Sequence, residues 1–130
     1  MEKIIKATCG VLRAGDLVLM AQRPKGKVQA GYWEFSGGKI EAEENVKEAL
    51  VRELNEELGI SVAITDCKPL IYLEQRYPHA MVHLHVFEIT KWSGAVKGIE
   101  GQQLFWHNIK EKCTLEPLLL ATEKILVNIF

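Results

Sequence analysis

The chain has 130 residues, of which 48% are hydrophobic and 25% charged, and its formal net charge is -1 at pH 7. This length predicts one folded domain, and the composition is that of an ordinary globular protein rather than of a disordered, collagenous or membrane chain. Such a balanced charge offers no basic surface for a nucleic-acid backbone, so we expect no nucleic acid polymer and no membrane as partner.

Two further features indicate the compartment. The start of the chain has no long apolar segment, and no run of about 18 apolar residues occurs anywhere. The three cysteines, Cys9, Cys67 and Cys113, are widely separated and lack the spacing of a zinc site. We therefore expect reduced thiols in a cytoplasmic protein.

The first part of the chain predicts two strands and a long loop. The runs from Ile4 to Leu12 and from Leu17 to Gln22 are rich in Val, Ile and Leu, and residues 14–16 between them are typical of a turn. They are interpreted as a β-hairpin or as two strands of one sheet. The segment from Pro24 to Ile40 is rich in glycine and aromatic residues and is expected to be a long, functional loop.

Local signals predict a helix from Val46 to Leu58. Asn45 is a good N-cap residue, Glu48 follows three positions later as in a capping box, and Gly59 supplies the C-terminal stop.

The remainder of the chain predicts three strands and a closing helix. The strands are expected at Val62 to Glu74, Ala80 to Thr90 and Gln103 to Trp106. Apolar residues near helical spacing predict an amphipathic helix from Leu118 to Phe130. This order of elements is βαβ-like with extra strands and indicates an α/β protein.

Three acids on the first helix form the clearest candidate for chemistry. Glu53, Glu56 and Glu57 fall within an arc of about 100° on one helix face, because residues three and four apart are neighbours. Carboxylates this close repel one another unless they are well solvated or share a cation. A divalent ion such as Mg²⁺ prefers oxygen ligands and neutralises a diphosphate, whereas the competing interpretation is a solvated acidic surface.

A longer motif decides between the two interpretations. From Gly38 to Ile60 the sequence GKIEAEENVKEALVRELNEELGI resembles the Nudix box, G-x5-E-x7-R-E-U-x-E-E-x-G-U, in which U is a bulky aliphatic residue. Seven of its positions demand one residue type, so a chance match is about one in a billion per start site. All the specified positions are filled: Gly38, Glu44, Arg52, Glu53, Leu54, Glu56, Glu57, Gly59 and Ile60.

The resemblance extends over nearly the whole chain. Residues 21–24 (AQRP), 31–39 (GYWEFSGGK) and 83–85 (HLH) look like the MutT and CTP pyrophosphohydrolase branch of the Nudix hydrolase family. It implies a single domain over residues 1–130, folded as a Nudix-type α/β/α sandwich with a central mixed β-sheet. It also implies hydrolysis of a nucleoside triphosphate to monophosphate and pyrophosphate, with Mg²⁺, or Mn²⁺ in its place, in a monomer or homodimer.

The resemblance further implies roles for individual residues. Glu53, Glu56 and Glu57 would bind the metal together with the carbonyl of Gly38 or Gly37, and any of the three could orient the attacking water. Glu100, which precedes Gly101-Gln102, matches a later glutamate that binds metal or acts as base, although a solvated loop acid is an equal alternative. Two further positions are expected to hold the loop and the helix together as a carboxylate–arginine pair, Glu44 and Arg52.

The substrate side is less sharply defined by the same resemblance. Arg23 and Lys39 are placed like residues that meet phosphates, with surface cations as the alternative. Thr122 stands where relatives carry an Asn or Asp that reads the base, and its hydroxyl can offer neither two-point amide recognition nor a charge. The other residues expected on the substrate or base side are Glu34, Phe35, Trp33, His83, His85 and Phe87.

Several functions remain open within this interpretation. The favoured substrate is CTP, dCTP or a modified pyrimidine nucleotide, and 8-oxo-dGTP is the nearest alternative. Other Nudix substrates, such as capped RNA ends, ADP-ribose or a prenyl diphosphate, are a second alternative. A non-catalytic Nudix-like nucleotide-binding module is the alternative from another class, although such modules usually lose box glutamates.

Overall fold

The computed structural model describes residues 2–130, so Met1, at the edge of the expected 1–130 domain, lies outside the described residues. Strands account for most of the regular structure, and two α-helices and one short 3₁₀ helix (η1) accompany them. In chain order the elements are β1 Ile4–Ala14, β2 Leu17–Gln22, β3 Trp33–Glu34, β4 Gly37–Lys39, α1 Val46–Leu58, η1 Ile64–Asp66, β5 Lys68–Tyr77, β6 Ala80–Ile89, β7 Gln103–Asn108 and α2 Leu120–Ile129.

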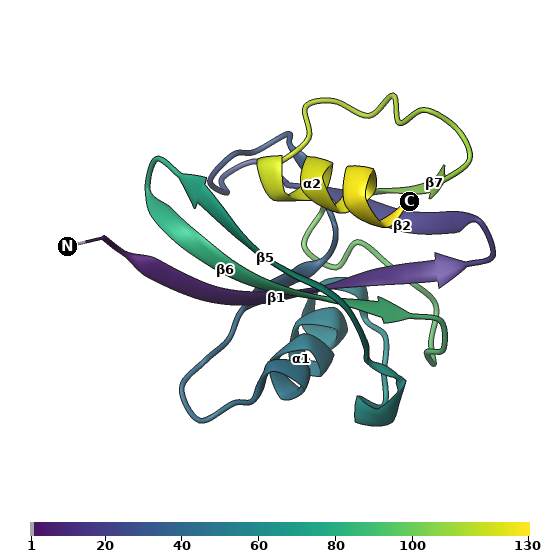
Figure 1. Ribbon diagram of the computed structural model, residues 1–130. Coiled ribbons are helices and arrows are strands. Elements are labelled where there is room, and N and C mark those ends of the chain that lie inside the picture. The colour runs from purple at the N-terminus through teal and green to yellow at the C-terminus, as the bar shows by residue number, and fades with distance from the viewer. Residues whose placement is uncertain (1) are drawn as a thin grey trace.

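The strands form one mixed sheet around β1, which confirms the expected α/β class. The order is β3-β2-β1-β6-β5, with β4 paired to β1 and β7 paired to β2. β1 runs parallel to β6 and antiparallel to β2 and β4. The two helices lie on opposite sides of this sheet, α1 below it and α2 above it in Figure 1, so the molecule has three layers.

Helix α1 begins and ends where its local signals predict. The side chain of Asn45 accepts a hydrogen bond from the Glu48 amide, the Glu48 carboxylate accepts one from the Asn45 amide, and Gly59 ends the helix at φ 70°. Its apolar stripe of Leu50, Leu54 and Leu58 is fully buried against the sheet. The acidic face of α1 is thereby turned away from this core.

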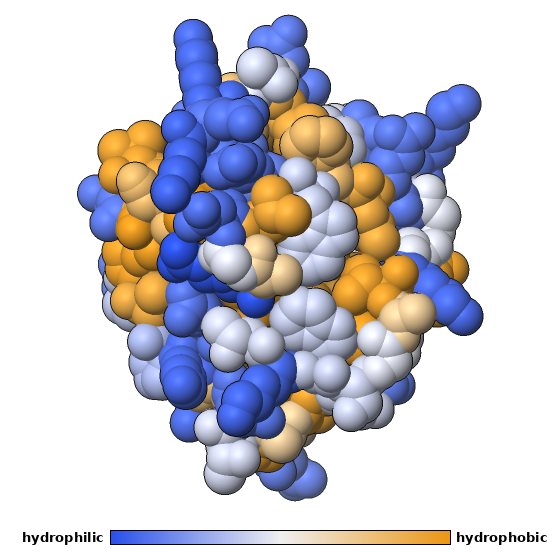
Figure 2. Space-filling view, turned by 90° about the vertical axis from the view of Figure 1, so that its right-hand side faces the viewer, coloured by the Kyte–Doolittle hydropathy of each residue, from blue (hydrophilic) through white to orange (hydrophobic). Residues whose placement is uncertain are grey.

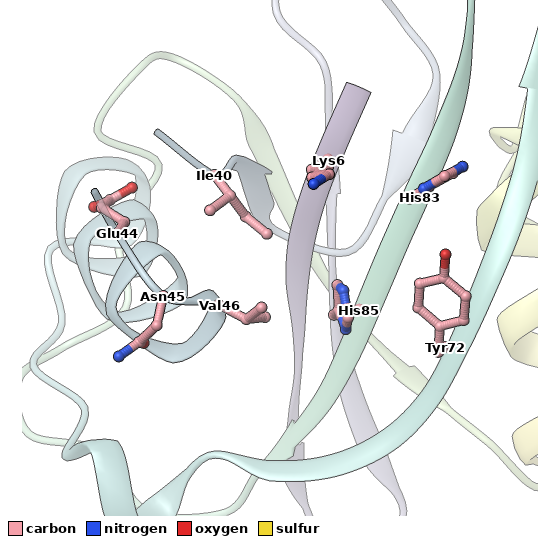
Figure 3. Close-up of a pocket in the computed structure, with 8 residues that line it drawn as sticks. All are labelled: Lys6, Ile40, Glu44, Asn45, Val46, Tyr72, His83 and His85. Carbon is pink, nitrogen blue, oxygen red and sulfur yellow. The ribbon is translucent and has the colours of Figure 1, made fainter. Parts of the chain in front are cut away.

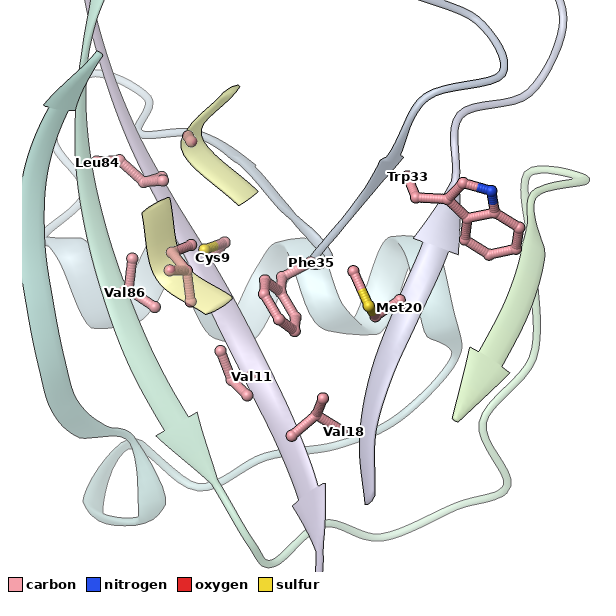
Figure 4. Packing of buried hydrophobic residues seen from close by; sticks show 10 residues of the cluster. Cys9, Val11, Val18, Met20, Trp33, Phe35, Leu84 and Val86 are labelled. Atoms are coloured by element: carbon pink, nitrogen blue, oxygen red, sulfur yellow. The ribbon is translucent and has the colours of Figure 1, made fainter. Parts of the chain in front are cut away.

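A second core lies between the sheet and α2. Cys9 and Val11 of β1 pack there with Val86 of β6, as Figure 4 shows, and Ile125 of α2 belongs to the same cluster. Helix α2 has no side-chain N-cap of its own. Instead the amide of Ala121 donates a hydrogen bond of 3.1 Å to the hydroxyl of Tyr77 at the end of β5. The start of α2 is therefore fixed by the sheet.

Two expectations about the elements are wrong. The segment from Pro24 to Ile40 is not only loop, because β3 and β4 lie within it and pair with β2 and β1. The strand expected at Val62 to Glu74 begins only at Lys68 and runs to Tyr77, and η1 precedes it. Val62 is buried beside α1, so its β-branched side chain serves helix packing rather than a strand.

The surface shows no continuous apolar belt on the face in Figure 2, where orange patches are divided by polar and weakly polar side chains. Within residues 2–130, neither helix is long and apolar enough to cross a membrane.

The contact between β4 and β1 depends on a glycine. A Cβ atom on Gly37 would lie 2.0 Å from the carbonyl oxygen of Thr8 and 2.5 Å from Cα of Cys9. Both neighbours are backbone atoms of the central strand, so neither can move aside. The neighbouring Ser36 is 3% exposed, and its hydroxyl has no hydrogen-bond partner among residues 2–130.

We predict that Gly37→Ala lowers the free energy of unfolding by about 3 kcal/mol or more, because β4 must separate from β1. The matched control is Ser36→Ala, which removes an unpartnered buried hydroxyl and should leave stability unchanged or raise it slightly. Urea unfolding of both variants measures the difference. Equal stability of Gly37→Ala and wild type would contradict the close packing of these strands.

Candidate active site

A cavity of about 370 Å³ opens beside α1, β4 and the loop before β7. It is unusual in gathering many carboxylates in one place, together with a smaller number of cations. The acids that line it are Glu34, Glu53, Glu56, Glu57 and Glu100, and the cations are Arg23, Lys27 and Lys39. Every residue for which a metal, catalytic or phosphate role is expected from the sequence is therefore at or next to this cavity.

Arg52 holds the segments around the cavity together. Its Nε donates to Glu44 Oε2 at 2.7 Å and its Nη2 donates to Glu44 Oε1 at 2.9 Å, a two-point contact that lowers the pKa of Glu44. The same guanidinium donates to Glu53 Oε1 at 2.8 Å and to the carbonyl of Lys39 at 3.1 Å. One side chain thus connects the loop before α1, the helix and β4.

Gly38 allows the backbone to reach the acidic face of α1. A Cβ atom at this position would lie 2.4 Å from Cδ of Glu53 and 2.6 Å from each of its carboxylate oxygens. Only glycine fits there, and the close approach places backbone of β4 beside a carboxylate. Carboxylate oxygens beside a closely approaching backbone, whose carbonyls can supply a further ligand, suit a hard divalent cation.

Glu57 is an acid of the cavity with a strongly raised pKa. Burial, together with hydrogen bonding to Glu53 and the charges of Glu34 and Glu100, raises the pKa of Glu57 to about 9. Within residues 2–130 no three metal-binding side chains already stand at ligand spacing, and Glu57 instead lies in a pair with Glu53 whose negative charges would repel one another. Such a pair favours any partner that brings positive charge, so the residues present fit a divalent metal ion.

The loop that carries Glu100 is tied to the end of α1. The amide of Gln102's side chain donates to the carbonyl of Glu57 at 2.8 Å, and its Oε1 accepts from the amide of Glu100 at 2.8 Å. The amide of Ile99 also donates to the Glu57 carbonyl, at 3.1 Å. Gln102 was not singled out by sequence analysis for this role, because only the folded chain brings it to the helix.

Arg23 faces the cavity but is already engaged. Its Nη2 donates to Glu34 Oε1 at 3.1 Å, its Nε lies 3.1 Å from Glu34 Oε2, and its Nη1 donates to the carbonyl of Val28. Burial raises the pKa of Glu34, and the adjacent guanidinium opposes that shift. Arg23 therefore stabilises a half-buried carboxylate in addition to facing the space where a phosphate is expected.

A larger, more apolar cavity of about 690 Å³ adjoins the acidic one. Phe35 and Leu84 are among its apolar walls, and Thr122, only 3% exposed, lies where α2 begins. Tyr77 also lines it, although nothing in its sequence context distinguishes it from an ordinary strand tyrosine. The cavities share several residues, namely Arg23, Lys27, Glu34, Gly37, Gly38 and Lys39.

Four residues expected on the base side lie elsewhere. His83 and His85 project from the opposite face of β6 into a separate groove that Lys6 and Tyr72 also line (Figure 3). Phe87 packs against the α1 core, and Trp33 is buried in the α2 core without lining the apolar cavity. The residues of β6 that do line the cavity are Val82 and Leu84, which alternate with the histidines.

Comparison with known proteins gives a consistent result. The NUDIX domain matches residues 7–127 of the chain. The CTP pyrophosphohydrolase of Escherichia coli K12 is 35% identical over 109 residues, which cover 84% of this chain and 79% of that protein. An 8-oxo-dGTP diphosphatase of Buchnera aphidicola (subsp. Acyrthosiphon pisum) is 39% identical over 94 residues, 72% of each chain.

Solved structures agree with this fold. The solution structure of the E. coli ORF135 protein has a TM-score of 0.81 at 33% identity, over 97% of this chain and 88% of that one. The crystal structure of a MutT NUDIX hydrolase from Burkholderia pseudomallei has a TM-score of 0.87 at 23% identity, over 99% and 100% of the two chains, and supports the fold alone.

The raised pKa of Glu57 predicts how the metal-free protein responds to pH. Since the folded-state pKa is about 9 and the ordinary value is 4.5, the folded protein holds more protons than the unfolded chain between these values. The contribution of Glu57 to the free energy of unfolding should therefore be most favourable below about pH 4.5 and should fall as the pH rises toward 9. Glu57→Gln removes this dependence.

Thermal unfolding in the presence of a chelator measures this pH dependence of stability. We expect Glu57→Gln to melt at a higher temperature than wild type at pH 8, and the difference to shrink toward pH 5. Glu123→Gln, on the exposed side of α2, is the control and should follow wild type at every pH. Parallel pH profiles of wild type and Glu57→Gln would contradict a buried, protonated Glu57.

Proposed function

The chain belongs to the Nudix family, and from that premise we propose that it hydrolyses a nucleoside triphosphate to the monophosphate and pyrophosphate with Mg²⁺ as its ion. It is a hydrolase of phosphoric anhydrides. One observation carries the fuller proposal: Glu53, Glu56 and Glu57 line one cavity together with Gly38, and this cavity shares residues with a second, apolar cavity. The first suits a metal and phosphates, and the second suits a nucleoside.

The metal site is assigned to Glu53, Glu56 and Glu57, with the Gly38 carbonyl and Glu100 as further oxygen donors. A bound Mg²⁺ supplies charge neutralisation at the phosphates and polarises the phosphorus toward water. Deprotonated Glu53 or Glu57 can orient the attacking water and accept its proton. Arg52 keeps Glu53 in place through its 2.8 Å hydrogen bond and is a positioning residue.

The phosphates and the nucleoside are assigned to different walls. Lys39 and Arg23, both shared between the cavities, are the proposed phosphate contacts. Glu34 lines both cavities, and Phe35 and Thr122 line the apolar one, where we place the nucleoside. The hydroxyl of Thr122 offers neither the two-point edge of an amide nor a charge, so base selection there depends mainly on shape.

For the substrate we propose CTP, dCTP or a modified pyrimidine nucleotide, in keeping with a relative named CTP pyrophosphohydrolase. The alternative, 8-oxo-dGTP, is supported by several relatives named 8-oxo-dGTP diphosphatase. A binding module without activity would have less need of all the box glutamates. We further propose a single-domain cytoplasmic enzyme, monomeric or homodimeric.

Mutation of the proposed ligands tests the mechanism. We predict that Glu53→Gln and Glu57→Gln each lower turnover at least about a hundredfold at saturating Mg²⁺, because each removes a charged ligand. Glu43→Gln is the control, since this exposed box residue occupies a position without a required residue type. Circular dichroism verifies folding, and near-normal turnover of both ligand variants would place the ion elsewhere.

A substrate panel tests the reaction and the base preference. The purified protein is incubated with Mg²⁺ and each of CTP, dCTP, 8-oxo-dGTP, ADP-ribose, a capped RNA end and a prenyl diphosphate, and products are separated by chromatography. We expect monophosphate and pyrophosphate, fastest with a pyrimidine nucleotide, and no product when a chelator is present. Release of orthophosphate and a nucleoside diphosphate would contradict the proposed position of cleavage.

A further inference from the structure

Lys27 lies where the acidic and apolar cavities meet, and it lines both of them. Its Nζ is 3.9 Å from Glu100 Oε1, and the two side chains are 54% and 42% exposed. An ion pair this long and this solvated contributes little to stability, so it can be exchanged for another partner at small cost. No resemblance assigned a role to this lysine.

The other cations of the cavity do not suffice to balance the charge of a bound triphosphate. A triphosphate carries several negative charges, and here it must enter a cavity already lined by five glutamates. Arg23 is engaged by Glu34 through contacts of 3.1 Å. Lys39 has no ion-pair partner in the described chain, and Lys27 has only the loose contact with Glu100. Lys27 and Lys39 are thus the cations most available to a substrate.

The backbone on both sides of the Lys27–Glu100 contact is held in place. On one side, Gly31 donates from its amide to the Arg23 carbonyl at 2.9 Å, and Arg23 donates from Nη1 to the Val28 carbonyl at 3.0 Å. On the other side, Gln102 ties the Glu100 loop to the end of α1. Only the two side chains need to move for the contact to change.

We propose that Lys27 is a substrate-binding residue whose ammonium group leaves Glu100 and contacts the phosphate nearest the sugar when nucleotide and metal bind. The inference rests on the proposed hydrolysis of a nucleotide. Glu100 becomes available to the metal in the same exchange, so the two events favour each other. Without substrate, Lys27 competes with a divalent ion for Glu100.

Because of this exchange, Lys27→Gln should bind the metal ion more tightly and the nucleotide more weakly. In the absence of nucleotide the variant should bind Mn²⁺ about two- to fivefold more tightly, because Glu100 has lost its competing partner. The KM for the nucleoside triphosphate should rise about tenfold while kcat changes much less, because a charged contact to substrate is lost. Loss of a merely structural contact would not strengthen metal binding.

The matched control is Lys25→Gln, which removes the same charge from the same loop at an exposed residue that lines neither cavity. Mn²⁺ affinity is measured by calorimetry without nucleotide, and KM and kcat by product chromatography with the best substrate of the panel. If wild type turns over substrate but Lys27→Gln matches Lys25→Gln in KM, or binds Mn²⁺ no more tightly, the assignment of Lys27 is wrong. If wild type hydrolyses no nucleotide, the proposed function itself fails, and the Lys27 assignment with it.

Discussion

The guanidinium group of Arg52 is the contact on which the arrangement of the acidic cavity depends. It reaches both oxygens of Glu44, one oxygen of Glu53 and the carbonyl of Lys39 at distances between 2.7 and 3.1 Å. The planar fork of arginine makes these contacts in fixed directions, which the single ammonium of a lysine cannot do. Three segments that are separate in the sequence are thereby held in one geometry around Glu53.

The two glycines before Lys39 complete this geometry from the other side. Gly37 lets β4 lie against the backbone of β1, and Gly38 lets the same strand touch the carboxylate of Glu53. A side chain at either position would push β4 away, and the carbonyl held by Arg52 would move with it. The close approach of backbone to carboxylate is therefore a joint consequence of the central strand, the glycines and one arginine.

Helix α1 could be predicted from the sequence almost to the residue, because its signals are local. The capping box at Asn45 and the stop at Gly59 act within a few residues, and the spacing of Glu53, Glu56 and Glu57 is a property of the helix itself. The mixed sheet and the gathering of glutamates at one cavity also agree with what the Nudix resemblance implies.

The base side could not be predicted in the same way, for a physical reason. The alternation of His83, Leu84 and His85 shows that neighbouring side chains face opposite sides of the sheet, but not which side faces the apolar cavity. That choice depends on where β1 and α2 pack. Lys27 was missed for a related reason, since only the fold brings its loop opposite Glu100.

The two cavities differ in how firmly their walls are held, and this difference bears on specificity. The acidic wall is fixed by charge-assisted hydrogen bonds from Arg52 and by a helix with both caps satisfied. The wall that carries Thr122 begins a helix without a side-chain cap, held at its first turn by the Tyr77 hydroxyl. Substitutions near Thr122 or Tyr77 can therefore reshape the apolar cavity while the glutamates around Gly38 keep their positions. A fold built in this way can retain one phosphate chemistry while its base preference changes.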